Sequence, residues 1–373
     1  MKKITILALV LSLILAISVA GCNTATPAQS SSPSGTENTG TQTETDPEDE
    51  SGGVVYVYNW GEYIDQTIFK DFEEETGIRV VYREFQNNEE MYSILSSGIA
   101  TYDVIFPSDY MISRMIDEDM LEELDFSNIP NYDLIDDAYK NMEYDPDGKY
   151  SVAYMTGTVG LIYNSAMIDE EIDSWSALFD SAYEGQILMF DNSRDAFGIA
   201  LKYLGYDQNT TDESEIREAY DLLVEQKPIL QAYVMDQIFD KLESGEAAIG
   251  PYYAGDYLIM REANPDLVFV RPVEGTNVFV DAMCIPKGAA NKANAELFIN
   301  YMCDTDVAYQ NMEFIWYASA NAQAAEQFLD ELDEEDIEIM FASEETLATC
   351  DVFTNLPMEI NDLYNTLWSE LKR

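Results

Sequence analysis

The sequence contains no histidine. Its absence excludes Ser-His-Asp and Cys-His catalysis, histidine proton relays and every metal site built on histidine. Cysteine is also scarce: Cys22, Cys284, Cys303 and Cys350 occur without any CxxC spacing. Because three remain once Cys22 is set aside, at most one pair could form a disulfide. The pattern favours neither a zinc site nor a disulfide framework, and we expect buried free thiols.

Basic residues are few, with 19 Lys and Arg against 71 Asp and Glu and a formal net charge of -52. This balance argues against nucleic acid as a partner. Such a field would attract a cationic ligand, but general surface acidity that serves solubility or adaptation to salt or acid explains the charge equally well. No P-loop or GxGxxG follows a predicted strand and no internal repeat occurs, so nucleotide binding has no support.

The N-terminus predicts export. Lys2 and Lys3 precede an apolar stretch over residues 4–19, which predicts a signal peptide over residues 1–21. This stretch is shorter than the ~20 residues that a membrane-spanning helix needs. Residues 19–22, Val-Ala-Gly-Cys, resemble the bacterial lipobox, in which the cysteine is acylated. We therefore expect Cys22 to anchor the chain to the outer face of the cytoplasmic membrane or within the periplasm.

The next segment, residues 22–53, is rich in Ser, Thr, Pro, Gly, Asn and Glu and ends in an acidic run at residues 46–50. It cannot bury enough apolar surface to fold. We interpret it as a disordered tether between the lipid and a folded domain, with no binding role.

The remaining chain has the length and the apolar content for one large domain or two lobes, since 47% of all residues are hydrophobic. Helical patterns cover residues 68–76 and a segment that follows Asn87 and Asn88. A further helix begins at a capping box of Asp212 and Glu215 and ends at Gln226. The chain after Pro286 is mainly helical through Trp368. Strands are predicted at residues 54–58, 79–82, 102–106, 152–163, 187–190, 247–249, 267–270 and 278–285. The alternation of strands with helices predicts an α/β fold with largely parallel sheets.

In open α/β sheets, ligands bind beyond the carboxyl ends of the strands. Trp60, Glu62 and Tyr63 follow the first predicted strand, and Ser108 and Tyr110 follow the third. Later strand or helix ends carry residues 191–195, 252–256, 279–281 and 316–317. An aromatic residue beside an acidic residue recurs in these loops.

Aromatic faces attract ammonium groups and cover methylene chains, while carboxylates bind amines through charge-assisted hydrogen bonds. A linear polyamine offers both surfaces. Each cation–π contact contributes ~0.5–2 kcal/mol, with the larger value in a site closed off from water. A single aromatic residue after a strand usually belongs to the core, so the prediction of a pocket for a small organic cation rests on the joint occurrence of these pairs.

From about Val54 to the C-terminus the chain resembles the spermidine/putrescine-binding proteins of ABC importers, within the periplasmic-type solute-binding proteins. The most specific stretches are residues 56–63, 102–110, 219–220, 242–246 and 281–286. The resemblance implies a type II periplasmic-binding-protein fold of two α/β lobes, each a mostly parallel sheet flanked by helices. Strands would cross between the lobes near residues 154–158 and 279–281. Lobe 1 would comprise residues 54–156 plus 280–318, and lobe 2 residues 157–279 plus 319–373.

The resemblance also implies a set of ligand-binding residues. An acid pair of the family falls on Asn192 and Asp195, so one carboxylate has become an amide, and two family tryptophans fall on Tyr253 and Phe279. The stretch that contains Asp256 resembles the putrescine-preferring branch of the family, in which that aspartate contacts an amine. Tyr317 matches a family tyrosine at the pocket edge. The full implied set is Trp60, Glu62, Tyr63, Ser108, Tyr110, Asn192, Asp195, Tyr253, Asp256, Phe279, Asp281 and Tyr317. The amide at Asn192 together with the presence of Asp256 narrows the expected ligand toward a short diamine such as putrescine, with spermidine still open.

The function implied by the resemblance is capture of a polyamine between the lobes and delivery to an ABC permease driven by a cytoplasmic ATPase. Such a protein catalyses no reaction and needs no cofactor. We expect a monomer whose only contact with the membrane is its lipid anchor. Ligand would bridge the lobes and stabilise the closed form by hinge motion.

Three other functions stay open. A ferric-ion binder of similar architecture could use Tyr252 and Tyr253, although adjacent side chains of an extended segment point to opposite faces. A surface hydrolase could use Asp191 and Asp195 as an acid and base, but nothing in the sequence positions a nucleophile. An adhesin would bind no small ligand tightly.

Overall fold

The computed structural model describes residues 53–373. The predicted signal peptide, the acylation site at Cys22 and the tether lie outside these described residues. Among the helices of residues 53–373, none has the length and apolar character needed to cross a membrane.

The first half of the described chain forms a parallel sheet with β1 (Gly53–Trp60) between β2 (Ile78–Phe85) and β3 (Val104–Ile105). Val55 and Val57 of β1 are fully buried, which explains the β-branched run at this position. Helix α1 (Ile68–Thr76) ends at Gly77, whose φ of 72° is a left-handed conformation that glycine adopts without strain. Helix α2 (Asn88–Ser97) is capped by Asn87, and α3 (Asp109–Asp117) follows β3.

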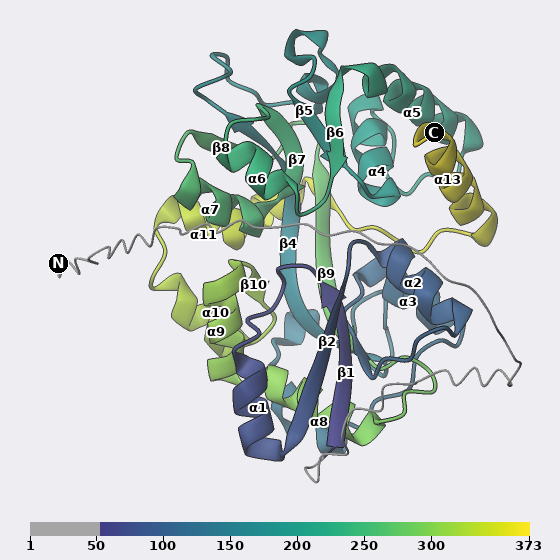
Figure 1. Ribbon diagram of the computed structural model, residues 1–373, viewed down its shortest axis with the longest axis vertical. Helices are drawn as coiled ribbons and strands as arrows, with labels where there is room; N and C mark the ends of the chain where they lie inside the picture. The colour runs from purple at the N-terminus through teal and green to yellow at the C-terminus, as the bar shows by residue number, and fades with distance from the viewer. Residues whose placement is uncertain (1–52) are drawn as a thin grey trace, which may run out of the picture. The chain divides into compact units, whose positions relative to one another are not determined.

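Two long strands connect the two halves of the described chain (Figure 1). β4 (Ser151–Asn164) pairs antiparallel with β9 (Thr276–Cys284), in a register that includes Met155↔Asp281 and Gly157↔Phe279. The predicted crossing of strands near residues 154–158 and 279–281 falls within this paired stretch. A register shift between Ala153 and Met155 interrupts the ladder just before it.

The second half places β5 (Ile187–Phe190) parallel to both β6 (Leu230–Val234) and β7 (Ile249–Tyr253). β7 and β8 (Leu267–Val270) pair antiparallel with the outer part of β4. The helices of this half are α4 (Ser193–Leu204), α5 (Glu213–Gln226), α6 (Ile238–Glu243) and α7 (Ala254–Ala263). The predicted fold class of two α/β parts joined by crossing strands is confirmed, with parallel pairs away from the crossing strands and antiparallel pairs at them.

The chain after β9 is mainly helical, as predicted. Two short strands interrupt it: β10 (Ala318–Ser319) pairs with β4, and β11 (Cys350–Asp351) pairs with β9. The helices are α8 (Lys292–Met302), α9 (Thr305–Ile315), α10 (Ala322–Leu329), α11 (Glu334–Met340), α12 (Glu344–Leu347) and α13 (Met358–Leu371). Short 3-10 turns occupy Phe126–Asn128, Pro130–Leu134, Asp137–Tyr139, Trp175–Phe179, Ser181–Tyr183 and Lys227–Ile229.

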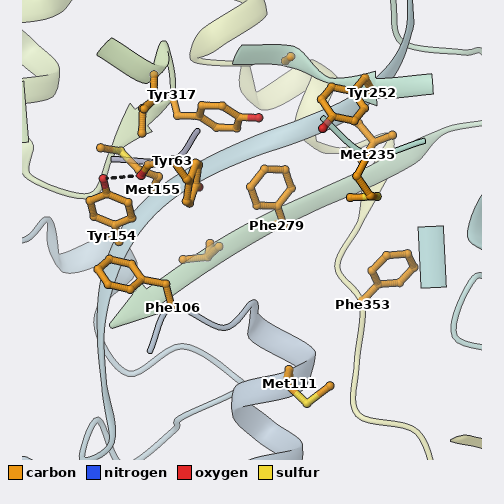
Figure 2. Packing of buried hydrophobic residues seen from close by; sticks show 14 of the residues in the cluster. Tyr63, Phe106, Met111, Tyr154, Met155, Met235, Tyr252, Phe279, Tyr317 and Phe353 are labelled. Carbon is orange, nitrogen blue, oxygen red and sulfur yellow. Dashed lines mark hydrogen bonds between the residues drawn. The ribbon is translucent and has the colours of Figure 1, made fainter. Parts of the chain in front are cut away.

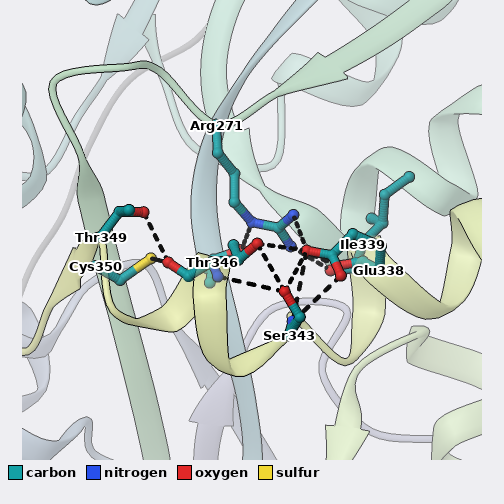
Figure 3. Close-up of polar contacts among 8 residues, drawn as sticks. Arg271, Glu338, Ile339, Ser343, Thr346, Thr349 and Cys350 are labelled. Carbon is teal, nitrogen blue, oxygen red and sulfur yellow. Dashed lines mark hydrogen bonds and ion pairs between the residues drawn. The ribbon is translucent and has the colours of Figure 1, made fainter.

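The segment from α11 to β11 is fixed by Arg271, which follows β8 (Figure 3). Its Nη2 donates to the backbone oxygens of Glu338 and Ile339 at 3.0 and 2.8 Å, and its Nε donates to Thr158 Oγ1 at 3.0 Å. The hydroxyl of Thr346 donates to the carboxylate of Glu338 at 2.6 Å. These bonds hold the segment against the crossing strand β4, and the segment ends beside the cavity described below.

Two local predictions need correction. Asp212 caps α5 by accepting from Ser214 N at 2.8 Å, but Glu215 does not close the predicted capping box. The Thr210 hydroxyl instead accepts from Asp212 N at 3.1 Å and donates to Glu215, so it occupies both groups that the box would have joined. The strand predicted at residues 247–249 begins at Ile249 and runs to Tyr253.

The three cysteines of the described chain are free thiols, as predicted. Cys284 and Cys303 are buried, whereas Cys350 is half-buried.

Candidate functional site

A single cavity at the crossing strands is lined by all twelve residues of the predicted ligand-binding set. Its empty volume is about 730 Å³, part of which is open to solvent. These twelve residues come from the ends of β1 and β7 and the segments that follow β1, β3, β5 and β7, from β9 and from the residue after the C-cap of α9. In Figure 2 the rings of Tyr63, Tyr317 and Phe279 lie near the crossing strands, with Tyr252 and Phe353 farther along. The structure therefore brings the predicted residues together, while their role in binding stays a prediction.

The loop after β1 holds Trp60 in a fixed orientation. Its indole N–H donates to the backbone oxygen of Phe106 at 2.8 Å, and its ring centroid lies 4.8 Å from that of Phe85. Glu62 adopts a left-handed backbone conformation with φ of 48° and is exposed at the cavity rim. The next residue, Tyr63, is buried. The loop thus offers an aromatic face, a solvated carboxylate and a buried hydroxyl within four residues.

Helix α3 begins at the cavity. Ser108 Oγ accepts from Asn88 Nδ2 at 3.0 Å, and Tyr110 Oη donates to Glu89 Oε1 at 2.9 Å. Both hydroxyls are therefore tied to α2. The ring of Tyr110 lines the cavity wall.

The amide oxygen of Asn192 is occupied by the backbone of α4 and is not free to accept from a ligand. Its Oδ1 accepts from Arg194 N and Asp195 N at the start of α4, and its Nδ2 donates to Asp195 Oδ2 at 2.7 Å. Because both lone pairs of Oδ1 accept from the backbone of α4, Asn192 offers an ammonium group no acceptor and serves to position Asp195.

Four cavity carboxyl groups each accept a hydrogen bond from a tyrosine hydroxyl. The pairs are Tyr63 to Asp281 at 2.8 Å, Tyr317 to Asp256 at 2.8 Å, Tyr253 to Asp195 at 3.2 Å and Tyr252 to Asp236 at 3.2 Å. A phenol that donates to a carboxylate stabilises its ionised form and fixes its orientation. Tyr317 was predicted at the pocket edge. The structure places it in the cavity lining and buries it.

Burial raises the pKa of three of these groups, because desolvation disfavours the charged form. The pKa of Asp281 rises to about 6, that of Asp195 to about 7 and that of Asp256 to about 8. The Ser108 hydroxyl and then Tyr63 oppose the rise in pKa at Asp281, while Tyr253 and Tyr317 oppose it at Asp195 and Asp256. Asp281 is only 4% exposed and its Oδ1 has no hydrogen-bond partner. Within residues 53–373 no Lys or Arg pairs with any of the three. Such a set of carboxyl groups favours a cationic guest.

Aromatic rings supply the apolar walls. The ring centroids of Phe279 and Tyr253 are 5.5 Å apart, and those of Phe279 and Tyr317 are 6.1 Å apart. Tyr63 meets Tyr317 edge to face at 5.2 Å. Tyr253, Phe279, Tyr317 and Tyr63 therefore form a continuous aromatic wall.

Alternation along β7 does not keep either Tyr252 or Tyr253 out of the cavity. Both line the cavity, because it lies beyond the end of β7 and reaches both faces of the last residues of that strand. Their hydroxyls donate to different carboxyl groups, Asp236 and Asp195. In the part of the chain that the structure describes, no group of three or more acidic or cysteine side chains is arranged to hold a metal ion.

Sequence reasoning missed several lining residues, among them Asp236, Asn277 and Phe353. Asp236 comes after β6, a strand whose mixed sequence Leu-Gln-Ala-Tyr-Val gave no clear pattern, so the rule that ligands lie beyond strand ends was never applied to it. Phe353 follows the two-residue strand β11, which has no sequence signal. Asn277 lies in β9, one residue before the strand predicted at residues 278–285, and no pattern singled it out. Its Oδ1 is buried without a hydrogen-bond partner.

Comparison with known proteins agrees with this geometry. Residues 67–338 match the family model of bacterial extracellular solute-binding proteins. The chain belongs to that family. Relatives of this solute-binding protein include the spermidine/putrescine-binding periplasmic protein of Escherichia coli K12, 34% identical over 277 residues that cover 74% of this chain and 80% of the relative. A putrescine-binding periplasmic protein of the same organism is 29% identical over 292 residues, which cover 72% of this chain and 78% of the relative.

Solved structures give the same assignment. The spermidine/putrescine ABC transporter substrate-binding protein of Streptococcus pneumoniae, in complex with calcium and HEPES, has 35% identity and a TM-score of 0.70 over 86% of this chain and 98% of that chain. A lipoprotein of Treponema pallidum has 28% identity and a TM-score of 0.75 over 85% and 99%. The predicted family resemblance is confirmed. This solute-binding protein is not an enzyme, and the hydrolase alternative is wrong.

Proposed function

We propose that this solute-binding protein captures a linear polyamine, putrescine or spermidine, and delivers it to the permease of an ABC transporter. The observation that carries the proposal is the buried Asp281, whose unpaired Oδ1 lines a cavity walled by aromatic rings. The names of the relatives from Escherichia coli and Streptococcus pneumoniae support the same ligand class.

In this proposal each amine meets a carboxylate and the methylene chain lies between aromatic faces. Asp281 Oδ1 and Asp195 accept from one ammonium group, while Asp256 accepts from another. The carbon chain contacts Trp60, Tyr253 and Phe279. Charge-assisted hydrogen bonds fix the nitrogen positions, and removal of water by the rings strengthens them.

We also propose that residues 54–156 plus 280–318 and residues 157–279 plus 319–373 act as two lobes that close about β4 and β9. The first lobe would supply Trp60 and Asp281, and the second Asp195 and Asp256. A ligand that contacts both lobes binds the closed form better than the open form, so it shifts the population toward closure.

The proposal is tested by thermal unfolding with putrescine, cadaverine, spermidine and spermine. A ligand that binds only the folded state raises its stability by RT ln(1 + [L]/Kd), about 2.7 kcal/mol at a hundredfold excess over Kd. If none of the four amines raises the unfolding temperature at millimolar concentration and low salt, the proposal fails. A visible tyrosinate-iron colour without any response to amines would favour the ferric alternative.

Trp60 provides a direct reporter of the site. Trp60→Ala should weaken amine binding at least about fivefold, corresponding to the loss of ~1 kcal/mol of cation–π and methylene contact. The intrinsic fluorescence change on amine addition should disappear in this variant. Trp368→Phe, on α13 outside the cavity lining, is the matched control and should keep both the affinity and the fluorescence change. Wild-type affinity in Trp60→Ala would place the ligand elsewhere.

We further propose that acylated Cys22 anchors the monomeric protein to the membrane beside its permease, whose ATPase is a separate chain. The described Treponema pallidum relative is itself a lipoprotein. In the native host, Cys22→Ser should release the protein into the soluble fraction and abolish incorporation of labelled palmitate. Membrane retention of the variant without label would contradict the anchor.

A further inference from the structure

A fourth aspartate faces the cavity from the second half of the molecule. Asp236 lies between β6 and α6, and its Oδ1 accepts from Tyr252 Oη at 3.2 Å. This is the same arrangement of tyrosine and carboxyl that orients Asp195, Asp256 and Asp281. Asp236 is half-buried, whereas those three aspartates are buried, so it belongs to the outer part of the cavity.

The loop after β1 has room for this carboxylate because its first residue, Gly61, has no side chain. A Cβ at Gly61 would overlap with Asp236 Oδ2, so any larger residue would displace the carboxylate. Asp236 therefore lies directly against the backbone between Trp60 and Glu62. A side chain that follows β6 thus completes the rim that the loop after β1 begins.

The outer part of the cavity holds several acidic side chains, and its described lining includes no lysine or arginine. After burial, the negative charges of Asp236 and Glu62 are the next causes that raise the pKa of Asp256, which shows that the three acids share one electrostatic environment. Burial and the charges of Glu62 and Asp236 likewise raise the pKa of Glu84. Within the described residues 53–373, none of these four acids forms an ion pair with Lys or Arg.

The inner part of the same cavity points independently to a cation. Asp281 Oδ1 is buried without any hydrogen-bond donor, and Asn277 Oδ1 is a second buried acceptor without a partner. Inner and outer acids together offer more acceptor positions than the two ammonium groups of a diamine can use. A linear triamine carries a third charge for the remaining position.

We infer that Asp236, together with Glu62, binds the outer ammonium group of a linear triamine such as spermidine. Asp236 is then the residue that lets the cavity accept a triamine although Asn192 has removed a carboxylate from its inner end. This inference rests on the proposed function. It assigns the selectivity between diamine and triamine to the outer rim.

The test is titration calorimetry of Asp236→Asn with spermidine and with putrescine at low salt. The substitution keeps the side-chain shape and the acceptor for Tyr252, and it removes one charge. We expect it to weaken spermidine binding about tenfold more than it weakens putrescine binding, the loss typical of one charge-assisted hydrogen bond. Asp240→Asn, which removes the same charge from an exposed position on α6, should change neither affinity more than about twofold.

Three outcomes distinguish the possibilities. Equal weakening of both amines would place Asp236 in a position common to diamines and triamines and would overturn the inference. Unchanged binding of both would overturn it as well. Failure of the wild-type protein to bind any amine would instead overturn the proposed function.

Discussion

Asp281→Asn should lower the affinity for both putrescine and spermidine by about 10- to 100-fold. The variant loses the ionised acceptor that lies buried and unpaired in the cavity. A hydrogen bond to a charged group contributes ~1.5–3 kcal/mol, and each 1.4 kcal/mol is tenfold in affinity. The loss should be larger at low salt, because salt screens the attraction between ligand and carboxylate. Calorimetric titrations at two ionic strengths measure both effects.

Folding and binding effects of this substitution can be separated. Asparagine keeps the shape of the side chain. Above pH 6 the ligand-free variant should be at least as stable as the wild type, because it has no buried carboxyl group to ionise. Asp266→Asn is the matched control, because it removes one charge from an exposed position outside the cavity. If Asp281→Asn binds both amines like the wild type, the inner ammonium position is not at Asp281.

Affinity should also depend steeply on pH, falling at least about hundredfold from pH 8 to pH 5, the loss expected if Asp195 alone must release its proton. Burial raises the pKa of Asp281, Asp195 and Asp256 to about 6, 7 and 8, so the empty cavity binds protons across this range. An ammonium ligand stays charged throughout and favours the ionised carboxylates. Binding must then displace protons at low pH, and each displaced proton costs tenfold in affinity per pH unit.

The same groups fix the sign of the stability change. Their folded-state pKa values exceed the unfolded value of about 3.9, so the folded protein binds more protons than the unfolded chain. Stability of the ligand-free protein therefore falls as pH rises from about 4 to about 8. Unfolding temperatures at pH 5, 6, 7 and 8, with and without putrescine, should show a ligand-induced rise that grows with pH. A rise of equal size at pH 5 and pH 8 would contradict this linkage.

The sequence predicted the chemistry of the cavity better than its boundary. Trp60, Tyr63, Asp195 and Asp281 were found because each follows or lies in a strand with a clear pattern, and parallel strands end at a common edge. Asp236 was missed because β6 is a partly exposed edge strand whose residues do not alternate. A rule based on periodicity therefore did not predict this strand.

Other failures arose where tertiary contacts override local rules. Alternation along a strand suggested that Tyr252 and Tyr253 face opposite sides, yet the cavity extends around the end of β7. Asn192 carries the right polarity for a ligand contact, but the N-terminus of α4 occupies its amide oxygen, the atom that could accept from an ammonium group. Phe353 reaches the cavity through contacts between residues far apart in sequence, because β11 pairs with β9 and Asn209 bonds the backbone of Val352 and Thr354.

The residues that line the cavity include no lysine or arginine. An α-amino acid such as ornithine or lysine has the same carbon chain and amines as putrescine or cadaverine, with one carboxylate added. That carboxylate would enter a wall of aspartates with no basic group to receive it, and an uncompensated buried charge is strongly unfavourable. The cavity can thus separate a diamine from the amino acid that yields it by decarboxylation, through repulsion alone and without any change in its shape.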